Sequence, residues 1–138
     1  MGKEIIIVTI SLGNDGAERI LTELARQWHH DGHEITVIQT SPNRYGTEYA
    51  LPEGIEQIQI HTTSSNKILR FLQEIKALIG ILKQRPNATC LSFLSASSFI
   101  LAISSWFVKN RMVFSERNNP RKVPVGKHQQ MLRDFAFR

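Results

Sequence analysis

The sequence predicts the α/β fold class: a Rossmann-like, doubly wound, mostly parallel sheet with helices on both faces. Residues 5–10 are an unbroken run of β-branched side chains, which is typical of a strand buried on both faces. Downstream, short apolar segments alternate with amphipathic segments, as in right-handed βαβ units with parallel strands. Such sheets bind ligands outside the carboxyl ends of their strands, so we expect a site in the loops that follow the strands.

The first loop and helix follow the first strand directly. Residues 11–16 have a turn composition, and residues 35–38 form the second predicted strand. Asp15 and Glu18 have the spacing of a capping box, and Gly32 can close the helix in a left-handed conformation. Six apolar side chains between Asp15 and Gly32 share one helical face: Ala17, Ile20, Leu21, Leu24, Ala25 and Trp28.

The middle of the chain contains a polar loop over residues 42–54 and a weaker, irregularly alternating strand over residues 55–60. Asn66 can cap the helix that follows, and Pro86 ends it. The apolar face predicted for this helix comprises Ile68, Leu72, Ile75, Ile79 and Leu82.

An uncharged run of 23 residues follows Arg85 and has two interpretations. Its length is sufficient for a helix that crosses a bilayer. Its six serines favour instead a buried strand over residues 89–93 and, after a serine-rich turn, a buried helix over residues 99–108 that Ser98 caps. Residues 112–115 are the fifth predicted strand.

The net charge of +5 over 138 residues is unevenly distributed. Residues 1–108 hold 9 basic and 10 acidic side chains, whereas residues 109–138 hold 8 basic and 2 acidic. This tail could face a cleft or a second domain, contact anionic lipid, or bind nucleic acid. We expect no nucleic-acid partner, because stacking aromatics are few and no groove-reading motif is present. The basic residues concerned are Lys109, Arg111, Arg117, Arg121, Lys122 and Lys127.

Other residue types indicate the compartment and exclude several chemistries. The single Cys90 excludes an internal disulfide and is expected to be buried packing rather than a nucleophile. The first ten residues lack the features of a secretory signal, which favours the cytoplasm, or the inner face of the cell membrane if the tail contacts lipid. His29 and His33 are spaced for a metal, but residues 31–32 interrupt the helix between them, so we expect no metal and no other cofactor.

The loop over residues 11–16 lies where free backbone N–H groups and a helix dipole form an anion site. A tight turn would equally explain its two glycines, Gly13 and Gly16. A dinucleotide site is disfavoured, because the loop lacks Gly-x-Gly-x-x-Gly and the second strand ends in Gln39 and Thr40 without an acidic residue. The Walker pattern is also absent.

Two stretches carry a resemblance to a known family. The first combines the apolar strand and Ser-Leu, the glycine loop, Gly-Ala-Glu-Arg at residues 16–19, an amphipathic helix, and Asp-Gly-His-Glu-Ile-Thr-Val-Ile at residues 31–38. It resembles the amino-terminal domain of family 4 retaining glycosyltransferases, which have the two-domain GT-B fold. The second, Ser-Glu-Arg-Asn-Asn-Pro at residues 115–120, is similar to a stretch in members that build bacterial cell-surface polysaccharides and glycans.

The resemblance implies site residues but no catalytic residue. Relatives often have two adjacent glycines where this sequence has Asp15 followed by glycine, and an acidic side chain beside a diphosphate is unfavourable unless it caps the helix. The catalytic histidine of many relatives has no clear counterpart here. The residues implied to bind donor phosphate or acceptor are Gly13, Asn14, Asp15 and Gly16 in the first loop, and Glu116, Arg117 and Asn118 after the fifth strand.

The resemblance also implies a role for residues 1–138 as the acceptor-side half of a two-domain enzyme. These residues do not include the domain that would hold the nucleotide-sugar donor, so we expect a truncated chain that is inactive alone. The implied reaction transfers a sugar from that donor to a cell-surface glycan or lipid-linked acceptor with retention. The alternative is a non-catalytic Rossmann-like module that binds a phosphorylated ligand or a partner protein through residues 13–16.

Overall fold

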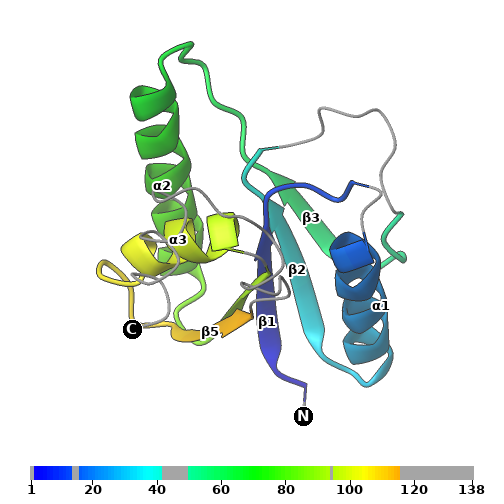
Figure 1. The fold of residues 1–138 in the computed structure, drawn as a ribbon. Helices are drawn as coiled ribbons and strands as arrows, with labels where there is room; N and C mark the ends of the chain where they lie inside the picture. The colour runs from blue at the N-terminus through cyan, green and yellow to red at the C-terminus, as the bar shows by residue number, and fades with distance from the viewer. Residues whose placement is uncertain (1, 14–15, 42–49, 94, 116–138) are drawn as a thin grey trace, which may run out of the picture.

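The computed structural model describes residues 2–13, 16–41, 50–93 and 95–115. They form one parallel sheet in the order β3-β2-β1-β4-β5, together with three helices (Figure 1). The strands are β1 (Glu4–Thr9), β2 (Glu34–Gln39), β3 (Glu56–Gln59), β4 (Thr89–Phe93) and β5 (Arg111–Ser115). The helices are α1 (Gly16–His30), α2 (Lys67–Gln84) and α3 (Ser95–Ser104). The predicted fold class is confirmed.

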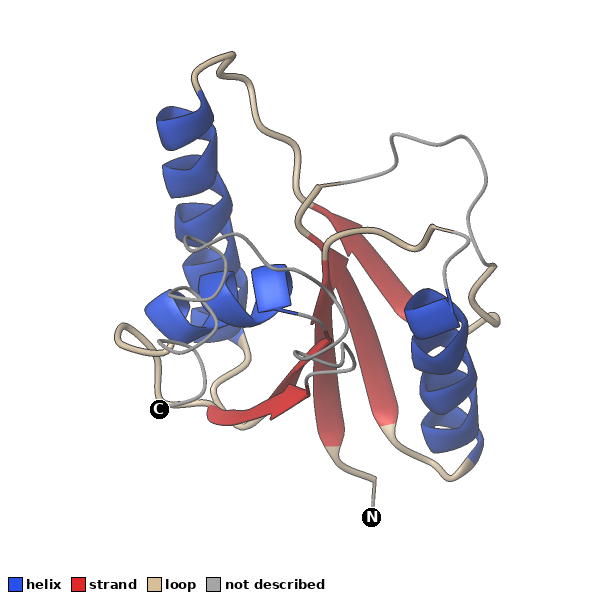
Figure 2. Cartoon of the chain, in the orientation of Figure 1, coloured by secondary structure: helices blue, strands red, loops and turns tan. Residues whose placement is uncertain are grey.

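The helices cover the sheet from both sides, as predicted. Figure 2 shows α1 on one side and α2 and α3 on the other. Alternate residues of β1 therefore enter different cores: Ile7 packs with Leu21 of α1, whereas Val8 packs with Leu78 of α2. Both side chains of β1 are fully buried, which confirms the two-sided burial expected from its β-branched run.

The end of α1 follows from the turn that the sequence contains. Gly32 has φ 90°, in the left-handed region that favours glycine. Its N–H donates to the carbonyl of His29 at 3.1 Å, and the N–H of His33 donates to the carbonyl of Trp28 at 3.0 Å. This pair of bonds is the Schellman arrangement, so the predicted helix end is confirmed.

The start of α2 was predicted correctly, and its buried face in part: Ile75, Ile79 and Leu82 pack in the core as predicted. Asn66 caps the helix, accepting from two backbone N–H groups. Ile68 and Leu72 of the predicted core face are 71% and 53% exposed, whereas Leu78, which was not predicted, is fully buried. The reason is geometric: the first turns of α2 project beyond the carboxyl edge of the sheet, so no strand lies beneath them (Figure 1).

The predicted start and end of α3 were wrong. The helix spans Ser95–Ser104 rather than residues 99–108, and Ser98 lies inside it instead of capping it. The serines are compatible with a helix because their hydroxyls have partners: Ser97 donates to the carbonyl of Phe93, and Ser98 shares a buried hydrogen bond with Ser92 at 2.7 Å. The predicted serine-rich turn is therefore the first turn of α3.

The uncharged run following Arg85 is a strand followed by a helix, β4 and then α3. β4 lies between β1 and β5, and its Cys90 is fully buried. In the described part of the chain, no helix has the length and apolarity needed to cross a membrane.

Native Cys90 should not react with iodoacetamide at pH 8. Burial, and secondarily the Glu4 carboxylate, raise the pKa of its thiol to about 12, so only about one thiol in ten thousand is ionised at that pH. Mass spectrometry should find unmodified protein under native conditions and one adduct in urea. Fast native labelling would contradict the burial of this thiol.

Candidate functional site

The carboxyl ends of the strands lie together at one edge of the sheet. Register pairs Thr9, at the end of β1, with Gln39 at the end of β2, and Val8 with Ser92 of β4. From β1 the chain first builds outward through β2 and β3, and then returns to add β4 and β5 on the other side. The carboxyl end of β1 is therefore next to the topological switch point, where open α/β sheets bind ligands.

The loop after β1 is anchored in the core at its middle. Leu12 is fully buried, and the hydroxyl of Thr9 donates to the carbonyl of Ser11 at 3.2 Å. Among the described residues, a Cβ at Gly13 would meet no atom closer than 3.8 Å, and one at Gly16 would meet nothing within 4 Å. Neither glycine has a left-handed φ, so local geometry does not require them and the tight-turn explanation is weakened.

Glu18 lies in the first turn of α1, close to this loop in sequence. Its side chain belongs to the buried face of the helix, with Leu21 and Ala25. Its Oε2 atom has no hydrogen-bond partner among the described residues. The positive end of the helix dipole favours a negative group at this position. Asp15, the other half of the predicted capping box, lies outside the described residues.

Two polar residues at the end of β2 were not predicted as site residues. Gln39 and Thr40 are fully buried, yet the amide atoms of Gln39 and the hydroxyl of Thr40 have no partner within the described part of the chain. An unmet buried polar group costs about 1–3 kcal/mol, so such groups indicate a bound water or ligand. The signal in the sequence is a polar pair at the end of a buried strand, which we took only as a reason to disfavour a dinucleotide site.

At the end of β4, in contrast to the end of β2, the buried polar side chains have hydrogen-bond partners. The hydroxyls of Ser92 and Ser98 are both buried and bond to each other, which joins the strand to α3. Ser115, the last residue of β5, pairs with Phe93 at the same edge.

Most of the other predicted site residues lie outside the described residues. They are Asn14, Asp15, Glu116, Arg117 and Asn118, together with most of the basic tail.

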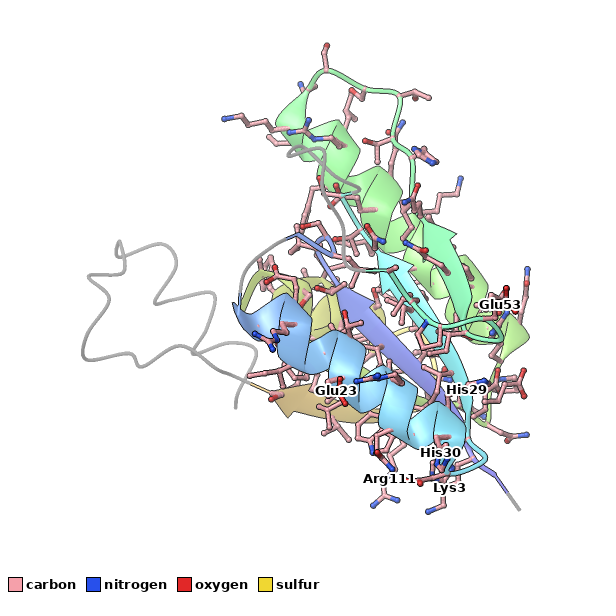
Figure 3. The ribbon with its side chains drawn as sticks, turned by 90° about the vertical axis from the view of Figure 1, so that its right-hand side faces the viewer. Lys3, Glu23, His29, His30, Glu53 and Arg111 are labelled. Atoms are coloured by element: carbon pink, nitrogen blue, oxygen red, sulfur yellow. The ribbon has the colours of Figure 1, made fainter. Side chains whose placement is uncertain are left out.

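Several basic side chains lie at the opposite edge of the sheet. Figure 3 shows Lys3, His30 and Arg111 together at the bottom of the view, where the strands begin. The Nδ1 atom of His33 accepts from the backbone N–H of Lys3 at 3.0 Å, which is a structural role. The described residues contain no group of three or more side chains arranged to hold a metal ion. These basic side chains therefore lie away from the candidate site at the carboxyl edge.

The fold and the position of the site define a Rossmann-like α/β domain with its candidate site at the carboxyl edge. The same fold occurs in WaaG, a glycosyltransferase involved in lipopolysaccharide biosynthesis, with a TM-score of 0.54 and 20% identity over 66% of this chain and 24% of that one. It also occurs in a glycosyltransferase from Rickettsia africae ESF-5, with a TM-score of 0.57 and 15% identity over 87% of this chain and 32% of that one.

The chain thus matches only about a quarter to a third of the length of these two structures. No family model matches the sequence, and no curated protein matches it. The similarity therefore concerns the fold of one part of each glycosyltransferase.

Proposed function

We propose that the chain is the amino-terminal, acceptor-side domain of a retaining glycosyltransferase that transfers a sugar from a nucleotide-sugar donor to a bacterial cell-surface glycan or lipid-linked acceptor. The observation that carries this proposal is the carboxyl edge, where the glycine loop, the first turn of α1 and the end of β2 all lie. The fold shared with two glycosyltransferases supports it, as does the resemblance of residues 11–19 and 31–38 to family 4.

The chemistry of this edge favours an acceptor sugar over a diphosphate. The Glu18 carboxyl group already occupies the positive end of α1, and a second anion beside it would be repelled. Glu18 offers an acceptor oxygen, and Gln39 offers both a donor and an acceptor. Sugar hydroxyls donate and accept hydrogen bonds, so they match this set. The donor diphosphate would then depend mainly on basic side chains of a second domain.

In the proposed reaction, the bond between the anomeric carbon and the diphosphate oxygen breaks, the acceptor oxygen bonds to the same face of that carbon, and the proton of the acceptor hydroxyl passes to the departing diphosphate. This domain contributes by holding the acceptor hydroxyl in position, which lowers the entropic part of the barrier. Stabilisation of the departing diphosphate falls largely to the second domain. We therefore propose that the 138 residues are inactive alone. We also propose that the enzyme works in the cytoplasm, and at the inner face of the membrane if the basic tail contacts lipid.

The test is sugar transfer by the two-domain enzyme, with a panel of nucleotide sugars and with glycan and lipid-linked acceptors. We expect transfer, with an anomeric configuration in the product, read by NMR, that matches the donor.

Glu18→Ala should raise the acceptor KM about tenfold and leave the donor KM unchanged, because it removes a hydrogen bond to the acceptor only. Gly16→Ala should also raise the acceptor KM, while the midpoint of urea unfolding does not fall.

Glu23→Ala is the matched control. Glu23 lies on the same helix but is exposed and pairs with Arg26, so its loss should leave both KM values unchanged. Absence of transfer with every donor would contradict the proposed activity. An inverted product would contradict retention, and equal acceptor KM values for Glu18→Ala and the parent would remove Glu18 from the site.

A further inference from the structure

The amino-terminal end of α2 carries an exposed apolar surface, formed by Ile68, Leu69 and Leu72, which we call the α2 tip. These side chains are 71%, 52% and 53% exposed. Their spacings of three and four residues place them side by side on the helix. This part of α2 projects beyond the carboxyl edge of the sheet (Figure 1). A cluster of large apolar side chains in such a position is typical of an interaction surface.

Basic side chains outnumber acidic ones in the part of α2 that carries the tip. Residues 66–79 contain three of them, Lys67, Arg70 and Lys76, against a single acidic residue. Lys76 lies one helical turn after Leu72, on the same exposed face. An apolar centre with basic flanks is complementary to an anionic lipid surface, where acyl chains receive the apolar groups and phosphates receive the cations.

The backbone at the α2 tip is already hydrogen-bonded within the chain. The Oδ1 atom of Asn66 accepts from the N–H groups of Ile68 at 2.9 Å and Leu69 at 3.4 Å. The Gln73 amide accepts from the N–H of Thr63 at 3.1 Å and donates to its hydroxyl at 3.2 Å. An apolar environment penalises unpaired backbone N–H groups, so this pairing lowers the cost of bringing the tip into a lipid interface.

We propose that the α2 tip docks on the surface of an anionic lipid bilayer. The three apolar side chains enter the boundary between headgroups and acyl chains, and the flanking cations contact lipid phosphates. This surface is separate in sequence from the basic tail of residues 109–138. The proposal does not depend on glycosyl transfer, so each can fail without the other.

The experiment is co-sedimentation of the full chain with vesicles of phosphatidylcholine alone or mixed with phosphatidylglycerol. We expect binding to the mixed vesicles to be at least about tenfold tighter, and to weaken as salt is added. Ile68→Ser and Leu72→Ser should each weaken it about tenfold. Replacing Lys67, Arg70 and Lys76 with glutamine should weaken binding to the mixed vesicles about fivefold per residue and reduce the salt dependence of that binding.

Two variants serve as matched controls, with circular dichroism to verify that each one folds. Ile20→Ser removes a 42%-exposed apolar side chain from α1, on the other side of the sheet. Lys83→Gln removes a charge from the far end of α2, more than a Debye length away. Each should change vesicle binding by less than about twofold.

Three results would overturn the proposal. The first is equal binding to both kinds of vesicle, or binding to neither. The second is unchanged binding by Ile68→Ser and Leu72→Ser, which would assign the contact to another part of the chain. The third is a dimer, seen by light scattering, that forms instead of the vesicle complex and is abolished by Ile68→Ser, because the tip would then be covered by a second copy.

Discussion

Replacing Leu78 with alanine should lower the free energy of unfolding by about 3–4 kcal/mol, measured by urea unfolding with circular dichroism. Leu78 is fully buried between α2 and the sheet, in a cluster that includes Val8 of β1 and Leu101 of α3. Its loss would leave a cavity where three elements meet, and the parallel strands beneath it have little freedom to close that space.

Leu72→Ala is the matched control, because it makes the same change on the same helix. Leu72 lies on the overhanging part of α2 and is largely exposed, so its loss should cost about 0.5 kcal/mol or less. The apolar pattern of the sequence predicted the opposite order, with Leu72 in the core face. A cost for Leu72→Ala as large as that for Leu78→Ala would show that α2 is rotated relative to the described structure.

Arg85→Ala should lower the free energy of unfolding by about 2–3 kcal/mol. The guanidinium group donates to the Thr36 hydroxyl and to the Glu56 carboxylate, each at 2.6 Å, and lies 3.6 Å from the Glu4 carboxylate. It is 22% exposed, so water replaces these bonds only in part. It therefore ties the end of α2 to the amino ends of three neighbouring strands, β1, β2 and β3.

The backbone at Arg85 should keep its path in the alanine variant, because the Asn110 amide donates to the Arg85 carbonyl at 2.6 Å whatever side chain is present. Arg85→Lys should recover part of the loss, since an ammonium group can still reach one acceptor but lacks the planar fork. Arg26→Ala is the control: Arg26 pairs with Glu23 on the exposed surface of α1, and its loss should cost less than about 0.5 kcal/mol. Equal losses of unfolding free energy in Arg85→Ala and Arg26→Ala would contradict the stabilising role of the Arg85 contacts.

Much of the fold follows from local sequence pattern. β4 has the predicted bounds, residues 89–93, because a proline and a polar turn precede a short apolar run. Asn66 and Gly32 mark a helix start and a helix end by chemistry that acts within a few residues. Alternation of strands and helices is enough to predict parallel pairing and helices on both faces.

The errors arose where burial depends on distant segments. The apolar residues of α2 outnumber the positions that the sheet can cover, so the sequence cannot show that Ile68 is exposed. Ser98 in the first turn of α3 has a buried partner in Ser92 of β4, a contact that forms only when the helix folds back on the strand. Serine composition alone favours a turn, and only the tertiary contact overrides it.

The candidate site and the stabilising contacts also divide into features that the local sequence pattern predicts and features that only the folded structure shows. By itself the sequence placed Gly13 and Gly16 at a carboxyl edge, because a strand followed by a glycine loop and a helix has only one arrangement in a parallel sheet. Only the tertiary structure showed that the Oε2 atom of Glu18 and the amide atoms of Gln39 are buried there with no hydrogen-bond partner among the described residues, and that Arg85 bonds to Thr36, 49 residues away. These features depend on which side chains the folded sheet encloses, and a pattern that repeats every two to four residues carries no information about that.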